Sequence, residues 1–106
     1  MSGFKTGKKG VVMVTNYQRG RAFEYKVKTE LERLGFFVIR CAGSKPCDLV
    51  AFKEGKPPIF IECKTSRGTL RKKYPYGPTL LVRKTPKWRE ELAAALAGLG
   101  YLNLED

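Results

Sequence analysis

Two short apolar segments, each with one acidic residue at or near one end, constrain this chain more than any other feature. Residues 48–52 read Asp-Leu-Val-Ala-Phe, and residues 59–64 read Ile-Phe-Ile-Glu-Cys-Lys. The turn sequence Glu-Gly-Lys-Pro-Pro lies between them, so the two segments are predicted to pair as a β-hairpin. A carboxylate buried in such a strand without a partner costs several kcal/mol. The acids therefore call for a compensating group, and a bound cation is a good one.

The predicted hairpin brings polar side chains together at its open end. Because side chains alternate along a strand, Glu62 and Lys64 share one face, roughly 6–7 Å apart, and Cys63 points the other way. Folding the chain about residues 55–56 places Asp48 opposite Cys63, to within one residue of register. Asp48, Glu62 and Lys64 are therefore predicted to converge.

The remaining segments predict an α/β fold, a single domain with a central mixed β-sheet flanked by helices. Residues 1–15 are a basic extension, and residues 16–106 form the domain. Helices are expected over about 17–34, ended by Gly35, and from Thr85 (as N-cap) and Pro86 to Gly100. Further strands are expected at 36–40, at 80–82 and at 101–104.

One more acid lies beside the apolar stripe of the first predicted helix. The stripe is formed by Phe23, Val27 and Leu31, and Glu24 falls on its edge. If this helix packs on the Glu62 face, Glu24 reaches the same place as the hairpin acids. The alternative is an ordinary surface pair with Lys28 one turn later, worth about 0.3 kcal/mol.

The composition narrows the chemistry that these acids can support. Lysine and arginine number 21 against 10 acidic residues, a net charge of +11 that suits a polyanion such as nucleic acid. There is no histidine, so hydrolysis must rely on carboxylates, lysine and a metal. Carboxylates bind Mg²⁺, which lowers the pKa of a bound water and neutralises phosphate charge. The sequence therefore favours phosphodiester hydrolysis.

The cysteines and the hydropathy pattern bear on location. Three cysteines without a secretory signal favour reduced thiols, and the absence of histidine and of a CxxC pair argues against zinc. No apolar stretch reaches about 18 residues, so no membrane span is expected. The expected location is the cytoplasm, or the cytoplasm of a host cell if the gene is viral.

The spacing of these residues resembles a known nuclease signature. Asp48, thirteen residues, and then Glu62-Cys63-Lys64 resemble the PD-(D/E)xK pattern. The chain is similar to archaeal-type Holliday junction resolvases over about residues 18–67. The matching segments are Arg19-Gly20-Arg21-Ala22-Phe23-Glu24, 34–36, 38–40, 42–44, Asp48-Leu49-Val50-Ala51 and 61–64.

This resemblance implies a homodimer with a restriction-endonuclease-like fold that nicks four-way DNA junctions symmetrically, using Mg²⁺ or Mn²⁺. It implies that Glu24, Asp48 and Glu62 are metal ligands, that Lys64 is the catalytic lysine, and that Ser44 takes part in catalysis. Arg19 would lie near the DNA backbone. The basic residues expected to contact DNA are Arg19, Arg21, Lys45, Arg67, Arg71, Lys72 and Lys73.

Two other functions remain open on the sequence. One is a nuclease of the same fold with a different DNA target, such as a repair or restriction enzyme, although 106 residues leave little room for recognition elements. The other is a non-catalytic nucleic-acid-binding module, which explains the charge but not the acids at strand ends. Tyr74 and Tyr76, next to the basic segment, either stack on bases or pack as ordinary loop residues.

Overall fold

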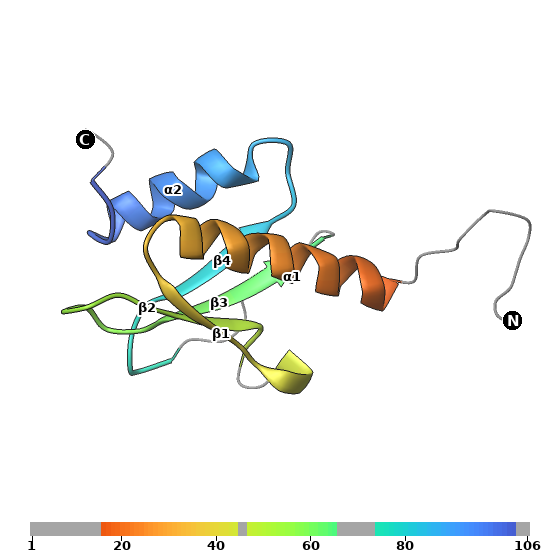
Figure 1. Cartoon of the computed structure of the whole chain (residues 1–106), viewed down its shortest axis with the longest axis horizontal. Coiled ribbons are helices and arrows are strands. Elements are labelled where there is room, and N and C mark those ends of the chain that lie inside the picture. Colours follow the sequence, from red (N-terminus) through yellow and green to blue (C-terminus); the bar gives the residue numbers. More distant parts are fainter. Residues whose placement is uncertain (1–15, 45–46, 66–73, 104–106) are drawn as a thin grey trace, which may run out of the picture.

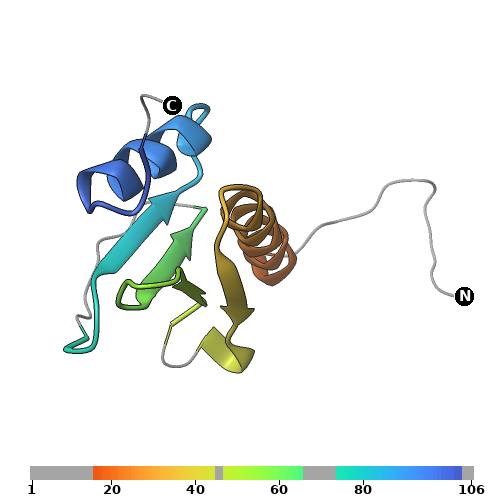
Figure 2. The same ribbon diagram turned by 60° about the vertical axis from the view of Figure 1, so that its left-hand side comes forward.

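The computed structural model describes residues 16–44, 47–65 and 74–103, and both of its helices lie over one face of a four-stranded sheet (Figures 1 and 2). The proposed extension, 1–15, lies outside the described residues. The elements, in order, are helix α1 (Asn16–Arg33), strand β1 (Phe37–Arg40), a short 3-10 turn η1 (Ala42–Ser44), strands β2 (Leu49–Phe52), β3 (Ile59–Lys64) and β4 (Thr79–Arg83), and helix α2 (Trp88–Gly98). The prediction of one α/β domain with a mixed sheet is confirmed.

The sheet has the strand order β1-β2-β3-β4. The β1–β2 and β2–β3 pairs are antiparallel, and the β3–β4 pair is parallel. The predicted hairpin is therefore β2 with β3. Its register pairs Leu49 with Ile61, one residue from the register that places Asp48 opposite Cys63 and within the stated margin.

The core lies between the two helices and the sheet face beneath them. Alternate strand residues supply it, as the period of two in a strand requires. Phe23 of α1 meets Trp88 of α2 edge to face, with ring centroids 5.3 Å apart. The apolar side chains buried in this layer are those of Phe23, Val27, Leu31, Phe36, Val38, Leu49, Ala51, Ile59, Ile61, Val82, Trp88, Leu92, Leu96 and Tyr101.

The predicted start of the second helix is wrong. Helix α2 begins at Trp88, because Thr85 and Pro86 belong to a preceding turn. The Thr85 carbonyl accepts a hydrogen bond from the Trp88 N–H at 3.2 Å, and its hydroxyl donates to Glu91 at 2.8 Å. The hydroxyl therefore does not cap the first helical N–H groups.

The strand expected at 101–104 is not present in its described part, 101–103. The Tyr101 side chain is instead buried, and its ring stacks on Phe36 with centroids 6.2 Å apart. Its hydroxyl donates to the Pro57 carbonyl at 2.8 Å. These side-chain contacts fix the segment after α2 against the β2–β3 turn without strand pairing. Among the described residues, neither helix combines the length and the apolar character needed to traverse a bilayer.

A buried acid joins the two helices. Glu30 is 8% exposed, accepts hydrogen bonds from the Arg33 guanidinium, and lies 3.8 Å from Arg89 of α2. The hydrogen bond from Arg33 and the charges of both arginines hold the Glu30 pKa below its ordinary value of 4.5, although burial opposes them. A lowered carboxyl pKa means that the ionised form stabilises the fold.

Glu30→Gln is expected to lower the free energy of unfolding at neutral pH by about 1 kcal/mol, because both arginines are largely exposed and solvent screens their charges. The contribution of Glu30 exists above its ordinary pKa and is lost as pH falls through the folded-state pKa. Urea unfolding at neutral and at acid pH measures it. The difference between wild type and variant should shrink in acid, and Glu90→Gln, an exposed change on α2, is the control.

Candidate active site

Asp48 is the most firmly positioned of the predicted site residues. It lies in the bend just before β2 and is 6% exposed. Its Oδ2 accepts the Cys63 backbone N–H at 2.7 Å, and its own N–H donates to the Ile61 carbonyl at 3.1 Å. The Cys41 N–H donates to the Asp48 carbonyl at 2.9 Å. The side chain and the main chain of Asp48 thus connect the start of β2 to β3 on one side and to Cys41, just after β1, on the other.

Glu24 reaches the sheet from α1. Its carboxylate accepts a hydrogen bond from Arg40 Nε at 3.2 Å, and both side chains are largely buried. Burial and then the charge of Asp48 raise the Glu24 pKa, while Arg40 lowers it. The alternative pairing with Lys28 is wrong, since Lys28 pairs with Glu32 at 2.7 Å.

Glu62 and Lys64 lie half-buried on β3, and α1 packs on the other face of that strand. The core includes Ile61, with Cys63 packed against it, so the alternation places Glu62 and Lys64 on the outer face. The condition under which Glu24 would share the Glu62 face, that α1 packs on it, is therefore not met. Glu24 instead approaches Asp48 from the helix side.

The three predicted metal ligands nevertheless act on one common neighbour, the Cys63 thiol. Burial raises the pKa of this thiol, and the charges of Asp48, Glu24 and Glu62 raise it further, in that order. One carboxylate comes from α1, one from the bend before β2 and one from β3. Acids from segments up to 38 positions apart along the chain therefore all affect this one thiol.

The donor chemistry of this carboxylate group fits a hard divalent cation. All its candidate ligand atoms are carboxylate oxygens, and the charge of Asp48 raises the pKa of Glu24, a repulsion that a cation would relieve. Within 16–44, 47–65 and 74–103, no three His, Cys, Asp or Glu side chains are arranged as a complete metal-binding group. The metal ligands accordingly stay a proposal.

Arg40 is a site residue that the sequence reasoning missed. It ends β1, pairs with Glu24, and its guanidinium lies 5.3 Å from the centre of the Tyr25 ring. The signal was available, because Val38 and Arg40 are two residues apart and so lie on the same face of a strand. A charged residue at the end of an apolar strand is a signal of the same kind as the acids Asp48 and Glu62.

The structure describes only part of the predicted DNA-contacting set. Arg19 and Arg21 are exposed on the first turns of α1, and Arg21 lies 6.0 Å from the centre of the Tyr25 ring. The structure describes the backbone of Ser44, which belongs to η1, but not its side chain. The residues Lys45, Arg67, Arg71, Lys72 and Lys73 also lie outside the described residues.

The two tyrosines after the basic segment differ. Tyr74 stacks on Phe60 with ring centroids 4.7 Å apart, so for Tyr74 the structure favours ordinary packing. Tyr76 is 74% exposed. Its exposed ring leaves the base-stacking prediction open for Tyr76.

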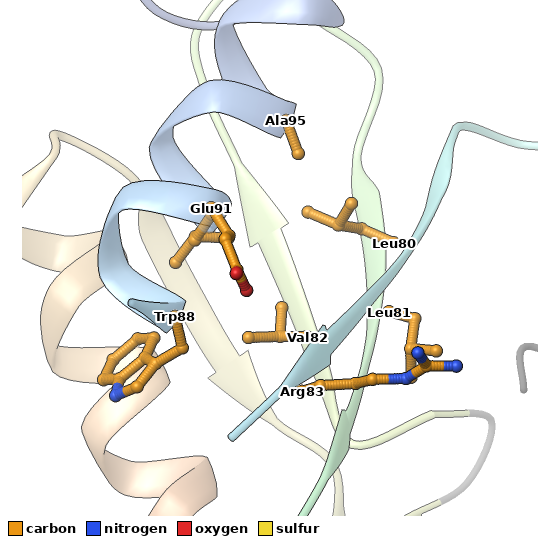
Figure 3. Close-up of a pocket in the computed structure, with 8 residues that line it drawn as sticks. Leu80, Leu81, Val82, Arg83, Trp88, Glu91 and Ala95 are labelled. Atoms are coloured by element: carbon orange, nitrogen blue, oxygen red, sulfur yellow. The ribbon is translucent and has the colours of Figure 1, made fainter. Parts of the chain in front are cut away.

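A small cavity between α2 and β4 is separate from the carboxylate group. Figure 3 shows Leu80 and Val82 pointing from β4 toward Trp88 and Ala95 of α2. The cavity measures about 50 Å³, which is room for a water or two and not for a substrate. Its lining includes none of the predicted site residues.

The fold is a mixed α/β sheet whose β2 and β3 ends carry the acids Asp48 and Glu62. The archaeal Holliday junction resolvase (Hjc) family matches residues 15–74, more than half of the chain. This chain belongs to that family. The matched range includes Glu24, Asp48, Glu62 and Lys64.

A relative supports the assignment. The crossover junction endodeoxyribonuclease Hjc of Methanocaldococcus jannaschii is 53% identical over 53 residues, which are 50% of this chain and 39% of that protein. This chain thus aligns with well under half the length of that relative. No solved structure matches the chain.

The buried thiols give a test of the site geometry. Cys47 is fully buried, and burial raises its pKa to about 12 from an ordinary 9.0, so its thiolate population at a given pH is about 1000-fold lower. Iodoacetamide at mildly alkaline pH is expected to leave Cys47 and Cys63 unmodified in the folded protein and to alkylate both in urea. Peptide mass mapping reads each site separately. Rapid labelling of Cys47 in the folded chain would contradict this packing.

Proposed function

We propose that this protein is a homodimeric, divalent-cation-dependent endonuclease that resolves four-way DNA junctions by nicking opposed strands. The observation that carries the proposal is that the charges of three acids, Asp48, Glu24 and Glu62, all raise the pKa of the Cys63 thiol. The chain that carries these acids belongs to the Hjc family. The relative's name, crossover junction endodeoxyribonuclease, supports the reaction and the substrate. Two opposed cuts require two active sites, which a twofold dimer supplies.

In this proposal Glu24, Asp48 and Glu62 hold Mg²⁺, and Mn²⁺ can substitute. The cation supplies an acidified water and neutralises charge on the scissile phosphate. Asp48 is the fixed member, since two backbone hydrogen bonds and its own carboxylate position it. Arg40 forms an ion pair with Glu24 and so offsets the negative charge of this carboxylate.

The remaining roles belong to cationic and hydroxyl side chains. Lys64 lies two residues after Glu62 on the same face of β3, where an amine can orient the attacking water or stabilise negative charge developing on phosphate. Ser44 follows the Gly43 turn next to Lys45, and we assign it a supporting catalytic role. The proposed backbone contacts are Arg19, Arg21, Lys45, Arg67, Arg71, Lys72 and Lys73, consistent with a net charge of +11.

Asp48→Asn is expected to reduce cleavage of a synthetic four-way junction by at least about 1000-fold in Mg²⁺, because it removes the most firmly positioned ligand. DNA binding should persist or strengthen, since a negative charge is lost from a surface that meets phosphate. Single-turnover cleavage and gel-shift titration at one fixed salt concentration measure the two effects. The control is Glu54→Gln, an exposed acid in the β2–β3 turn. Undiminished cleavage by the Asp48 variant would refute the metal assignment.

Junction selectivity needs its own comparison. The same strand is presented once within a four-way junction and once within a linear duplex, and the wild-type protein is expected to cut the junction far faster. Equal rates on the two substrates would favour a repair or restriction nuclease of the same fold. Binding without cleavage of either substrate, across Mg²⁺ and Mn²⁺, would favour a non-catalytic module.

Metal binding is also measurable without DNA. Mg²⁺ that binds the folded chain and not the unfolded chain stabilises it by about 2.7 kcal/mol at a hundred times its dissociation constant. A calorimetric melt should therefore shift upward with Mg²⁺ for wild type and not for Asp48→Asn. An equal shift in both proteins would place the bound ion elsewhere.

A further inference from the structure

The charged side chains on the outer face of the sheet lie together at one corner. Val82 of β4 is buried and points toward α2, so the next residue, Arg83, lies on the outer face, as Figure 3 shows. Among the described strand residues of this face, the charged ones are Glu62, Lys64 and Arg83. Since β4 is an edge strand, the ends of β3 and β4 form a charged corner on an otherwise uncharged face.

The backbone holds Arg83 directly beside Lys64. The parallel register of β3 and β4 pairs these two residues, and neighbouring strands lie about 4.8 Å apart, with paired side chains on one face. The pairing continues past the strand end, because the Lys84 N–H donates to the Lys64 carbonyl at 2.9 Å. The Thr85 N–H then donates to the Arg83 carbonyl at 3.0 Å. Arg83 therefore has a fixed backbone and an exposed side chain.

The charges of this corner suit a phosphate group. Two cations side by side on neighbouring strands repel each other, and an anion that contacts both removes that repulsion. Glu62, Lys64 and Arg83 together carry two positive charges and one negative charge, and in the proposed function Glu62 binds a divalent cation. The planar guanidinium of an arginine can donate to two oxygens of one phosphate, whereas a lysine amine acts as a point charge.

We propose that Arg83 binds, together with Lys64, the DNA phosphate at the cut site. This inference rests on the proposed function, in which Lys64 acts at the scissile phosphate. It adds a phosphate contact from β4, a strand that lies beyond the range matched by the family model, residues 15–74. Arg83 is also absent from the DNA-contacting set predicted from the sequence.

The first measurement is the salt dependence of DNA binding by the full chain, by fluorescence anisotropy in EDTA so that no strand is cut. Each neutralised phosphate of duplex DNA contributes about 0.9 to the slope of log K against log salt. Arg83→Gln is expected to lower the magnitude of this slope by about 0.9 and to raise the dissociation constant for a four-way junction about 10-fold. Arg83→Lys keeps the charge and should keep the wild-type slope.

The second measurement tests whether the contact lies at the cut site. Single-turnover cleavage in Mg²⁺, with enough protein to saturate the junction, reports the step after binding. Arg83→Gln is expected to lower this rate about 10-fold or more, because a misplaced reacting group is costly, and Arg83→Lys should recover part of the loss. The control for both measurements is Lys56→Gln, which removes the same charge from the exposed β2–β3 turn and should behave like the wild type. Circular dichroism checks that each variant is folded.

The outcomes separate this inference from the proposed function. An unchanged salt slope in Arg83→Gln would overturn the inference. A wild-type cleavage rate at saturation would also overturn it, because the contact would then lie away from the cut site. A slope lowered equally in Arg83→Lys would show a disturbed strand end and overturn it as well. In each case the nuclease proposal stands if the wild type cuts the junction. A wild type that cuts no DNA, with a slope lowered only in Arg83→Gln, would leave the phosphate contact standing and remove the nuclease proposal.

Discussion

The packing of both helices on a single face of the sheet is the constraint on which the rest of this structure depends. Phe23 and Trp88 meet edge to face over the strands, and with the alternate strand residues they exclude water from one layer. That arrangement brings Glu24 down to the sheet beside Asp48. It also leaves the other face to polar site residues at one end and to exposed phenyl rings at the other.

The carboxylates are held together at a cost that the fold partly offsets. Burial and the charge of Asp48 both raise the Glu24 pKa, and Arg40 works against them. Asp48 is held in place by a backbone donor, the Cys63 N–H, whose hydrogen bond to its carboxylate is 2.7 Å long. A small domain has little free energy to spare for such repulsion.

The outer face of the sheet carries both predicted site residues and exposed phenyl rings. Glu62 and Lys64 lie on the same face as Phe37 and Phe52, but on β3, which pairs with the strand of Phe52, and nearer the Asp48 end of the sheet. The phenyl rings and the acids therefore occupy different parts of one surface. The division follows from side-chain chemistry, since one part is uncharged and the other carries acids, Lys64 and its basic neighbours.

The sequence by itself determined the hairpin, its register to within one residue, and the identity of the acids. Alternation along a strand and turn residues at 54–58 are local properties, so Asp48 and Glu62 were placed at one end of the hairpin without a structure. Local pattern did not determine the start of α2, because the Thr85 hydroxyl bonds to Glu91 and not to a helical N–H. Nor did local pattern predict that the Tyr101 ring packs on Phe36 instead of belonging to a strand.

Only the tertiary structure decided which face of the sheet α1 covers. That choice depends on how the whole apolar layer, contributed by residues from 23 to 101, is best buried, and no single segment encodes it. It set Glu24 against Arg40 and Asp48 rather than on the Glu62 face, and it left Phe37 exposed. The residue types were legible in the chain, whereas their grouping followed from long-range packing.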